Sequence, residues 1–368
     1  MLCYKFRLYP KMEHGEKMLK TLELCRQTYN YFLTQLNGKD GMQKRIELQA
    51  QLPKLKAEKT ELQEVHSKAL QMVLYQLYSN LKALSKLKKN GKKVGRLRFK
   101  GRGWFKSFCY NQSGFKLIKT GKRLDILRLS KIGDIPIKVH RHVEGEIKQV
   151  IVKRHSGNWF ACICVEKEVN VVEREPKKAV GLDMGVKHFL TDSEGRQIEN
   201  PKFYDKTIER IRVAQHWLSR KKKNSKNYEK QRIKLAKLYE KLMNQRNDFL
   251  HKLSRFYVGS YDIICVEKLN IKNMVRNQNL AKKILDASWG KFLRLLEYKA
   301  ESAGVQVVKV NPRGTSKGLS YESSLRDWIS ANRIKMRGWD SPDSPAEVKP
   351  ILAFVPASFI IEAGSPFR

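Results

Sequence analysis

The sequence predicts a mixed α/β protein in which a β-rich module with a helical insertion precedes an α/β domain. Three observations support this prediction. Residues 11–94 place apolar residues at helical spacing, residues 95–170 alternate as short strands do, and the chain after residue 179 alternates strands with long helices. At 368 residues, 41% of them hydrophobic, the chain can form two or three domains with apolar cores.

The N-terminal half begins with an extended segment that Pro10 ends. The helical pattern that follows predicts helices over residues 18–33, 42–51 and 66–87. The alternating pattern predicts strands over residues 124–129, 135–139, 147–153 and 159–165. We therefore predict that residues 1–10 and 95–170 form one β-rich module, with residues 11–94 inserted into it.

The second half begins after a predicted linker at residues 171–178. Its two strands that end in an acid are separated by a basic helical stretch, residues 205–256, and are followed by a helix and a further strand at residues 288–303 and 304–310. This order fits a mixed sheet of the RNase H type over residues 179–338. Residues 339–368 contain several prolines without periodicity, which predicts a weakly ordered tail.

The chain is strongly basic, with a formal net charge of +39. Such a charge attracts polyanions, and nucleic acid is the commonest large one. A ribosomal protein or a basic protein of a membrane surface would share this charge. Because no run of 18 apolar residues and no apolar signal segment is present, we expect a cytoplasmic protein without a membrane partner.

The six cysteines form no CxxC pair and stand among apolar neighbours. Cys162 and Cys164 alternate along a predicted strand, so both would face one side of it. We predict small buried thiols and no zinc site.

The two strands with terminal acids carry the chemistry. The apolar run at residues 179–183 ends in Asp183, and the run at residues 263–267 ends in Glu267, 84 residues later. Neighbouring strands that end in carboxylates can share divalent ions, and two ions can assist a phosphodiester displacement. Asp183 could instead begin a turn before Gly185, and Glu267 could pair with Lys268.

Two basic segments predict nucleic-acid contacts. Cations for phosphates and aromatic rings for stacked bases alternate between residues 96 and 108, and a second basic run follows residue 220. The predicted contacts are Arg96, Arg98, Lys100, Arg102, Lys106, Lys221, Lys222, Lys223 and Lys226. Phe99, Trp104, Phe105 and Phe108 supply the rings of the first segment. A core with a solvated basic face, and a merely solvated helix, are the alternatives.

Six segments in this order resemble the TnpB (OrfB) family of transposon-encoded RNA-guided nucleases, which is related to the type V CRISPR effectors. The segments are Tyr4–Pro10, Cys25–Asn30, Gly95–Gly101 with Ser107 and Phe108, Gly181–Gly185, Val266–Asn270 and Asn311–Ser316. The resemblance implies a RuvC (RNase H-like) nuclease domain, a β-barrel-like wedge module and a helical recognition insertion. It covers nearly the whole chain.

The resemblance implies an RNA-guided DNA endonuclease that cuts target DNA beside a short flanking motif. Its third acid corresponds to Asp327, which could otherwise cap a helix that begins at Trp328. Asp183 would bridge two Mg²⁺ or Mn²⁺ ions, and Glu267 and Asp327 would each complete one coordination sphere. The residues that would read the flanking motif are Ser67, Lys68, Gln71, Tyr110 and Asn111.

The implied partners are a transposon-derived guide RNA and double-stranded target DNA. The protein would act at the nucleoid of a prokaryotic cell, as a monomer or alternatively as a dimer. The chain departs from the family at one place. No cysteine follows Cys265, so the four-cysteine zinc ribbon expected after Ser316 is predicted to be missing, and Leu325 and Ile329 replace an Asp and an Asn. A guided DNA-binding protein without nuclease activity is therefore the alternative.

Overall fold

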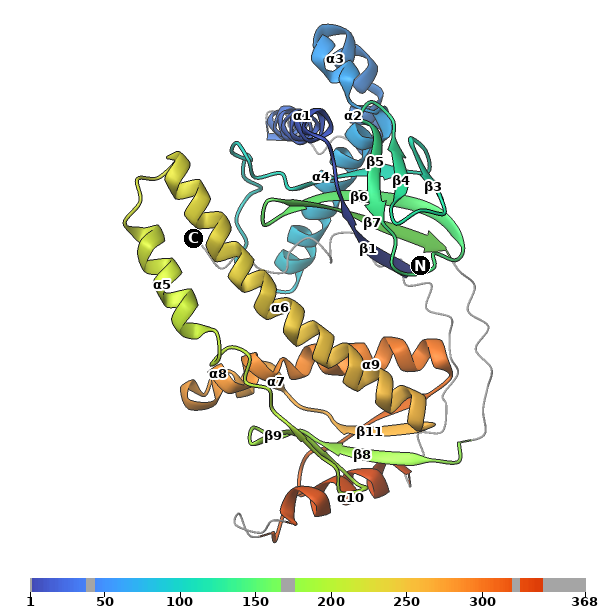
Figure 1. Cartoon of the computed structure of the whole chain (residues 1–368), viewed down its shortest axis with the longest axis vertical. Coiled ribbons are helices and arrows are strands. Elements are labelled where there is room, and N and C mark those ends of the chain that lie inside the picture. The colour runs from blue at the N-terminus through green and yellow to red at the C-terminus, as the bar shows by residue number, and fades with distance from the viewer. Residues whose placement is uncertain (1, 38–43, 167–175, 320–324, 340–368) are drawn as a thin grey trace. The chain divides into compact units, whose positions relative to one another are not determined.

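The structure is a computed structural model that describes residues 2–37, 44–166, 176–319 and 325–339. These residues divide into two compact units, one before and one after residues 167–175 (Figure 1). The predicted tail, apart from Trp339, and most of the predicted linker lie outside the described residues. No described helix combines the length and the apolar character that crossing a membrane requires.

The first unit contains a seven-stranded sheet in the order β2-β6-β7-β1-β5-β4-β3, in which every neighbouring pair is antiparallel. The strands are β1 (Leu2–Leu8), β2 (Ser107–Asn111), β3 (Phe115–Ile118), β4 (Asp125–Leu129), β5 (Gly133–Lys138), β6 (Glu146–His155) and β7 (Asn158–Glu166). The first strand lies between β7 and β5, so the start of the chain is held in the middle of the predicted barrel-like sheet.

The helices of this unit lie between β1 and β2 in the sequence. They are α1 (Met12–Asn37), α2 (Arg45–Ala50), α3 (Leu52–Glu58), the 3₁₀ helix η1 (Thr60–Glu64) and α4 (Ser67–Lys89). The predicted helix at residues 42–51 is shorter than expected, because Pro53 stands in the first turn of a separate helix, α3. Apolar side chains of α1 and α4 form one core with the sheet, and Phe32 and Leu74 are fully buried in it.

The cysteines differ in part from the expectation of free thiols. Cys3 of β1 lies directly across from Cys164 of β7, and the two form a disulfide. Adjacent antiparallel strands bring opposite residues close enough for such a bond, but the sequence does not reveal which residues are opposite. Cys25, Cys109, Cys162 and Cys265 are free, and all but Cys109 are fully buried.

The second unit contains a five-stranded mixed sheet in the order β10-β9-β8-β11-β12. Its strands are β8 (Ala179–Asp183), β9 (His188–Asp192), β10 (Gln197–Glu199), β11 (Ile263–Glu267) and β12 (Gln306–Val310). β11 runs parallel to both β8 and β12, whereas β9 runs antiparallel to β8 and β10. The carboxyl ends of β8, β11 and β12 therefore share one edge of the sheet.

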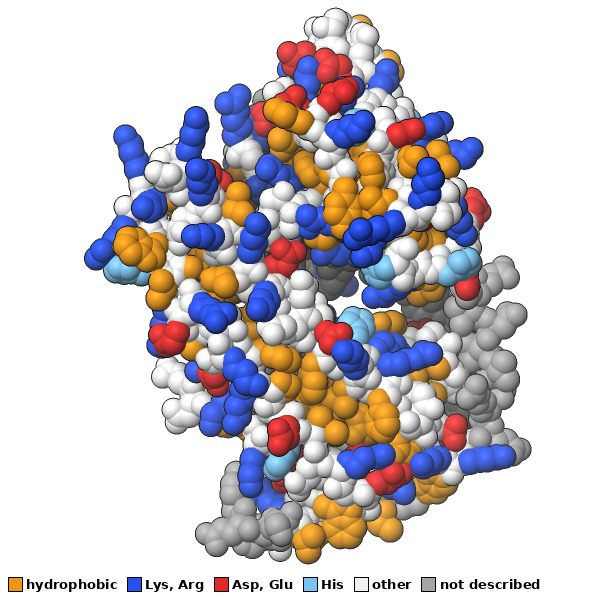
Figure 2. Space-filling view, in the orientation of Figure 1, with side chains coloured by type: hydrophobic (Ala, Val, Ile, Leu, Met, Phe, Trp, Pro, Cys, Tyr) orange, Lys and Arg blue, Asp and Glu red, His pale blue; other side chains and the backbone are white. Residues whose placement is uncertain are grey.

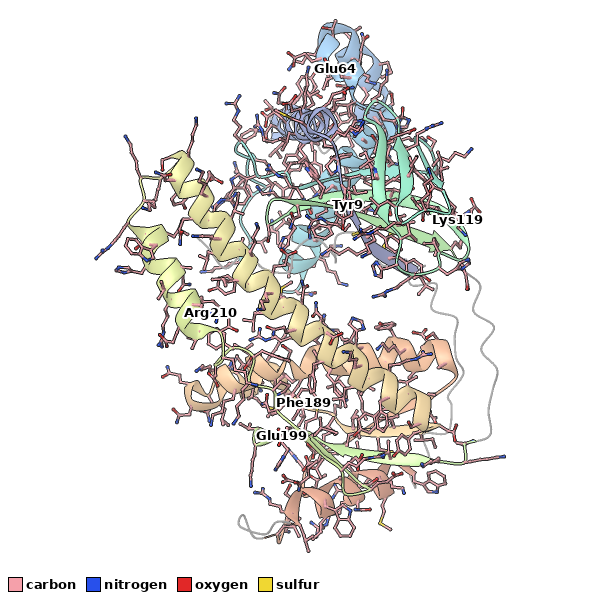
Figure 3. The ribbon with its side chains drawn as sticks, viewed as in Figure 1. Tyr9, Glu64, Lys119, Phe189, Glu199 and Arg210 are labelled. Atoms are coloured by element: carbon pink, nitrogen blue, oxygen red, sulfur yellow. A yellow bond between two sulfur atoms is a disulfide. The ribbon has the colours of Figure 1, made fainter. Side chains whose placement is uncertain are left out.

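The helices of the second unit are α5 (Ile208–Ser219), α6 (Lys226–Ser260), α7 (Ile271–Met274), α8 (Gln278–Ala287), α9 (Trp289–Ala303) and α10 (Arg326–Trp339). Figure 1 shows α6 and α9 on one side of β8 and β11, and α10 on the other side. Phe189 of β9 is buried in the core beneath α6 and α9 (Figure 3). The predicted basic helical stretch is thus two helices, and the C-terminal half of α6 covers the sheet.

Strand alternation decides which side chains meet which helix. Val180 and Leu182 of β8 belong to the core under α6 and α9, as do Ile264 and Val266 of β11. The alternate residues Ala179, Ile263 and Cys265 pack with Ile334 of α10. Successive side chains of a strand point to opposite faces, so the residues that end β8 and β11 face α10.

Candidate active site

The two predicted strand-end acids lie side by side. Leu182 pairs with Val266 in the parallel register of β8 and β11. Asp183 and Glu267 each follow one of these residues, and by alternation both face α10. The side chain of Asp183 is half-buried and that of Glu267 is 8% exposed. The sheet thus delivers both carboxylates to one edge.

Glycine lets α10 approach the sheet closely enough to reach these acids. A Cβ atom at Gly181 would overlap the Ala331 carbonyl oxygen and would lie 2.6 Å from the backbone nitrogen of Lys335. A Cβ at Gly338, near the other end of the helix, would overlap the side chain of Cys265. Neither contact leaves room for a larger residue, so the helix backbone rests on the strand backbone at Gly181 and on the Cys265 side chain at Gly338.

Asp327 lies in the first turn of α10, on the same side of the sheet as the other two acids. The helix begins at Arg326, so Asp327 is not the residue that precedes it, as the capping alternative required. A carboxylate in the first turn of a helix is stabilised by the unpaired backbone N–H groups there. This position suits a negative charge that must stand close to two others.

The three acids affect one another electrostatically. The pKa of Asp183 is raised to about 7, mainly because the carboxyl is partly buried and further because Glu267 and Asp327 add negative charge nearby, while Arg326 acts in the opposite direction. None of the three acids forms an ion pair in the part of the chain that the structure describes. A nearby cation would relieve this repulsion.

Thr315 holds Glu267 in place. Its hydroxyl donates to Oε1 of Glu267 at 2.7 Å, and both side chains are buried. Burial raises the pKa of Glu267, and the hydrogen bond from Thr315 and the charge of Arg337 lower it. The alternative that Lys268 pairs with Glu267 is not supported, because Lys268 is exposed and forms no such pair among the described residues. Thr315 lies in the segment Asn311–Ser316, which resembles a nuclease segment of the family, but the sequence predicted no role for this threonine.

The other side of α10 is tied to the turn between β9 and β10. The carbonyl of Ser193 accepts hydrogen bonds from Nε1 of Trp328 at 3.1 Å and from the Asn332 side chain at 3.3 Å. The fully buried Asp192 next to it accepts from Nε of Arg196 at 2.7 Å and from the hydroxyl of Tyr257 at 3.0 Å. This network joins the helix that carries Asp327 to the strand next to Asp183.

Across residues 2–37, 44–166, 176–319 and 325–339, no three His, Cys, Asp or Glu side chains converge tightly enough to hold one metal ion. The repulsion on Asp183 nevertheless comes from the other two acids. Charges act over several ångströms, whereas Mg²⁺ ligands lie about 2.1 Å from the ion. The site therefore has the hard oxygen donors that suit Mg²⁺ or Mn²⁺, gathered within electrostatic reach.

Residues 96–106 of the first basic segment form a loop, and its last two residues belong to β2. The expectation that Phe108 supplies a ring for stacking is wrong, because its side chain is only 4% exposed. Phe99 is 57% exposed and Trp104 is 69% exposed, whereas the ring of Phe105 packs edge-on against Tyr29 of α1. The side chain of Asn30 forms two hydrogen bonds with the backbone of Lys100, at 2.8 and 3.0 Å, which fix the loop to α1. Of the predicted contacts here, Arg96, Arg98, Arg102 and Lys106 are exposed, and Lys100 is half-buried.

The second basic segment is the turn between α5 and α6. Lys222, Lys223 and Lys226 are exposed, and Lys221 lies over the ring of Trp217 at 5.7 Å. Because Ser225 caps α6, the helix begins only after the three consecutive lysines, and a solvated helix is not the correct description of them. Arg210 is exposed and extends the basic surface along α5 (Figure 3). Figure 2 shows lysine and arginine side chains gathered over α5 and the start of α6.

The predicted readers of the flanking motif gather at the start of α4, with one exception. Ser67 is exposed, Lys68, Gln71 and Asn111 are half-buried, and Lys68 donates to the side chain of Gln112 at 3.4 Å. The prediction for Tyr110 is wrong, since its side chain is 1% exposed and its hydroxyl donates to the Ser130 carbonyl at 2.8 Å. Along β2 its neighbours Asn111 and Cys109 face the other side, and strand alternation turns Tyr110 into the core.

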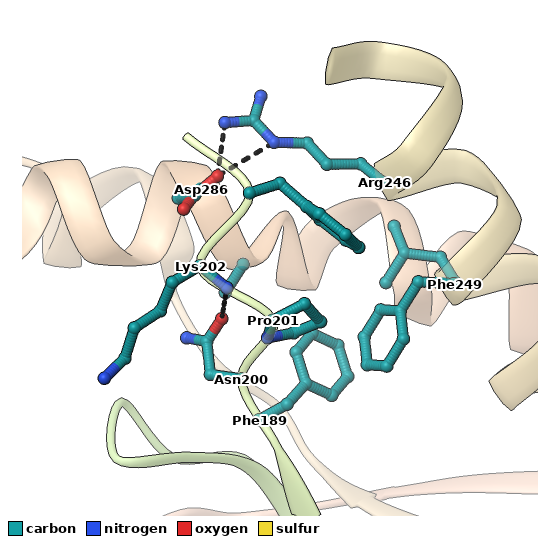
Figure 4. Close-up of a pocket in the computed structure, with 10 residues that line it drawn as sticks. Phe189, Asn200, Pro201, Lys202, Arg246, Phe249 and Asp286 are labelled. Atoms are coloured by element: carbon teal, nitrogen blue, oxygen red, sulfur yellow. Dashed lines mark hydrogen bonds and ion pairs between the residues drawn. The ribbon is translucent and has the colours of Figure 1, made fainter. Parts of the chain in front are cut away.

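A small recess in the second unit lies beside Asp286 of α8 (Figure 4). Asp286 pairs with Arg246 of α6 and accepts weak hydrogen bonds from the backbone nitrogen of Tyr204. Phe189 and Phe249 form an apolar wall. Asp286 is the only acid that lines this recess among the described residues, and it is already paired. Its bonds connect α8 to α6 and to the segment before α5, and the recess offers no free catalytic group.

Three family models match the chain. Residues 162–278 match OrfB_IS605, described as "Probable transposase", and residues 289–342 match the Cas12f1-like TNB domain. Residues 1–38 match a model described as a helix-turn-helix domain, although residues 2–37 form a strand and one long helix. The TNB match includes the segment in which the zinc ribbon is predicted to be missing, and this absence stays a prediction.

Two curated relatives are provisionally named RNA-guided DNA endonucleases. The protein of Streptomyces pristinaespiralis is 31% identical over 84% of this chain and 77% of its own length. The InsQ protein of Escherichia coli is 32% identical over 67% of this chain and 64% of its own length. A solved structure titled as a Cas12f1–sgRNA–target DNA complex shares the fold with a TM-score of 0.57, at 14% identity, covering 89% of this chain and 83% of that one. The chain therefore belongs to the OrfB (TnpB) family.

Proposed function

We propose that this protein is an RNA-guided DNA endonuclease whose second unit is a RuvC-type, RNase H-like nuclease domain. The observation that carries this proposal is the placement of Asp183, Glu267 and Asp327 on one face of a five-stranded sheet, within electrostatic reach of Asp183. The strand order, with β9 alone antiparallel among the central strands, agrees with that fold. The chain spans 77% and 64% of the lengths of the two relatives above, whose names point to the same activity.

The three acids would hold Mg²⁺ or Mn²⁺, which supplies an activated water and neutralises charge on the phosphodiester. Asp183 is coupled electrostatically to both other acids, so it would be the acid shared between the ions, and Glu267 and Asp327 would each complete the binding of one ion. Thr315 orients Glu267 by donating to its carboxylate, and this hydrogen bond favours the ionised form against the effect of burial. The close packing of α10 on Gly181 keeps Asp327 at the same edge.

The basic surfaces would bind the guide RNA and the DNA. In the first unit, exposed Trp104 and Phe99 stand among arginines and lysines and can stack on unpaired bases. Ser67, Lys68, Gln71 and Asn111 are the proposed readers of a short flanking motif, and base pairing with the RNA would supply the remaining specificity. The lysines between α5 and α6 would follow a phosphate backbone. In domain terms, the first unit combines the proposed wedge module with its helical recognition insertion.

The second candidate is an RNA-guided DNA-binding protein that does not cut. Two features favour it, namely the replacement of two polar residues of the family's third motif by Leu325 and Ile329, and the absence of a converged acid cluster among the described residues. The retained acids favour the nuclease, because a protein released from selection for cutting would be free to lose them.

The test is plasmid cleavage in Mg²⁺ by protein purified together with the RNA encoded beside its gene. The plasmid carries a guide-matched target next to a randomised flank, and Asp183→Ala is the control. Cleavage by the wild type that is absent in the variant supports the nuclease. Guide-dependent binding by both proteins without cleavage supports the second candidate, and salt-insensitive binding would contradict both.

A further inference from the structure

Two arginines of α10 bind the backbone of the loop that follows β12. Nη1 of Arg337 donates to the carbonyl oxygens of Asn311 at 3.1 Å and Arg313 at 2.8 Å. Nη1 of Arg333, one helical turn earlier, donates to the carbonyls of Thr315 at 3.1 Å and Lys317 at 2.8 Å. Each guanidinium thus joins two carbonyls, and together they span residues 311–317.

The same loop carries the hydroxyl that holds Glu267. Thr315 offers its carbonyl to Arg333 and its hydroxyl to Glu267, so one residue connects the arginine to the acid. Next to it, the hydroxyls of Ser316 and Ser330 lie 3.2 Å apart and add a further contact between loop and helix. Hydrogen bonds from a charged donor are stronger than neutral ones and fix the acceptors more tightly.

The packing of α10 against the sheet does not involve the guanidinium groups of the two arginines. That contact is made by Ala331, Ile334 and Gly338, which are buried against β8 and β11. The guanidinium bonds recorded for Arg333 and Arg337 go to loop carbonyls instead. Their removal should therefore loosen the loop while the helix stays in place.

We propose that Arg333 and Arg337 are positioning residues, which hold the loop at residues 311–317 so that Thr315 fixes the carboxylate of Glu267 beside Asp183. They also connect the second acid to the helix that carries the third. The proposal rests on the proposed function for its consequence in catalysis, and it concerns residues for which the sequence predicted no role. Neither arginine touches the reacting atoms. Both act through the backbone of the loop, and Arg337 also acts on Glu267 through its charge.

The experiment compares the full-length wild type with Arg333→Gln, Arg337→Gln and the double variant. Lys335→Gln is the matched control, because it removes one positive charge from the same helix and leaves both arginines in place. The first readout is hydrogen exchange of the backbone amides in the RNA-free protein. We expect faster exchange over residues 311–319 in the double variant, unchanged exchange in the buried turns of α10, and wild-type exchange in the control.

The second readout is titration of the proteins with Mn²⁺. We expect the double variant to bind Mn²⁺ about tenfold more weakly, as is usual when a group that orients a metal ligand is lost. Arg337→Lys separates the two contributions of an arginine, because it keeps the charge but not the planar pair of bonds. An affinity fully restored by lysine would overturn the proposal in favour of charge alone.

Unchanged exchange at residues 311–319 in the double variant would also overturn the proposal, whatever the metal affinity. Failure of the proposed function has a different signature, in which the wild type neither binds Mn²⁺ nor cuts DNA. The exchange measurement then still decides whether the arginines hold the loop. If the double variant does not fold, the single variants give the same comparison.

Discussion

Gly181 lies directly beneath the carbonyl group of Ala331, so that α10 rests on β8 with no side chain between them. Every residue larger than glycine would push the helix outward. We predict that Gly181→Ala destabilises the second unit by about 1–3 kcal/mol, as overpacked substitutions do. Since the helix carries Asp327, we also expect cleavage to fall about 100-fold, the usual effect of a displacement of about 1 Å at a catalytic group.

The control for this prediction is Gly259→Ala in α6, where an added Cβ would meet no atom within 4 Å. There the substitution should change the free energy of unfolding by less than about 1 kcal/mol, in the stabilising direction, because alanine favours a helix. Urea unfolding and plasmid cleavage measure the two effects. Equal behaviour of the two variants would contradict the close packing described for α10.

Thr315→Val removes the hydrogen bond to Glu267 while keeping the shape of the side chain. The hydroxyl lowers the pKa of Glu267, so its loss should raise that pKa further and leave less of the ionised form at low pH. We expect the acidic limb of the cleavage profile to move to higher pH and the rate at pH 6.5 to fall about tenfold or more. Thr315→Ser should retain the wild-type profile, and a valine variant with an unshifted limb would exclude this role.

Asp183→Asn should abolish cleavage and yet stabilise the metal-free protein at neutral pH. The pKa of Asp183 is about 7 in the folded protein, above the ordinary value of 3.8, so the folded state binds the proton more tightly than the unfolded state. Wild-type stability should therefore fall as the pH rises from about 4 to about 7, by at most about 4 kcal/mol. Asparagine cannot ionise and avoids this loss.

Urea unfolding in a chelator at pH 4.5 and pH 8 tests this expectation. The variant should exceed the wild type only at pH 8, and Mg²⁺ should then stabilise the wild type and not the variant. A variant that is less stable than the wild type at pH 8 would show that Asp183 is held by favourable contacts rather than repelled by its neighbours.

Trp104→Ala should weaken RNA binding by about 1–3 kcal/mol, the usual contribution of one aromatic ring that stacks on a base. Because the ring carries no charge, the dependence of the affinity on salt should stay unchanged. The contrasting variant replaces Lys221, Lys222 and Lys223 by glutamine and should lower the slope of log K against log salt by about 2–3. Fluorescence anisotropy with labelled RNA at several salt concentrations measures both, and a reversed pattern would contradict these assignments.

Tyr110→Phe should destabilise the first unit by about 1–2 kcal/mol, because the half-buried Ser130 carbonyl loses its donor. We expect no change in DNA binding, since the ring is covered by protein. Thermal unfolding and target binding are the measurements, with Asn111→Ala as the comparison that should weaken target binding. Weaker binding by Tyr110→Phe at unchanged stability would restore the original prediction.

The two strand-end acids could be predicted from sequence because they follow short apolar runs, and such runs report buried strands. The strand at residues 107–111 and the break between Ser219 and Lys226 were harder to predict. The first alternates over only five residues, and the second lies within a stretch whose charges suit helix and turn equally. Local propensity is weak where so few residues specify the structure.

Thr315 and the two arginines could not be found from sequence for a different reason. The bond from Thr315 to Glu267 and the bonds from the arginines to the loop join residues 16 to 48 positions apart, and they depend on the return of the loop and of α10 to the sheet. Tyr110 shows the converse error. A polar aromatic residue beside an asparagine resembles a contact surface, but its face of the strand was decided by the helix that covers it.

The position of Asp327 on the last described helix has a consequence for the order in which the protein is made. Asp183 and Glu267 are synthesised first, and the helix that brings the third acid leaves the ribosome only after both basic segments. Under the proposed function, a chain cut short before Arg326 would keep those basic segments but lack a complete set of acids. Truncated products would then compete with the intact enzyme for guide RNA instead of cutting DNA.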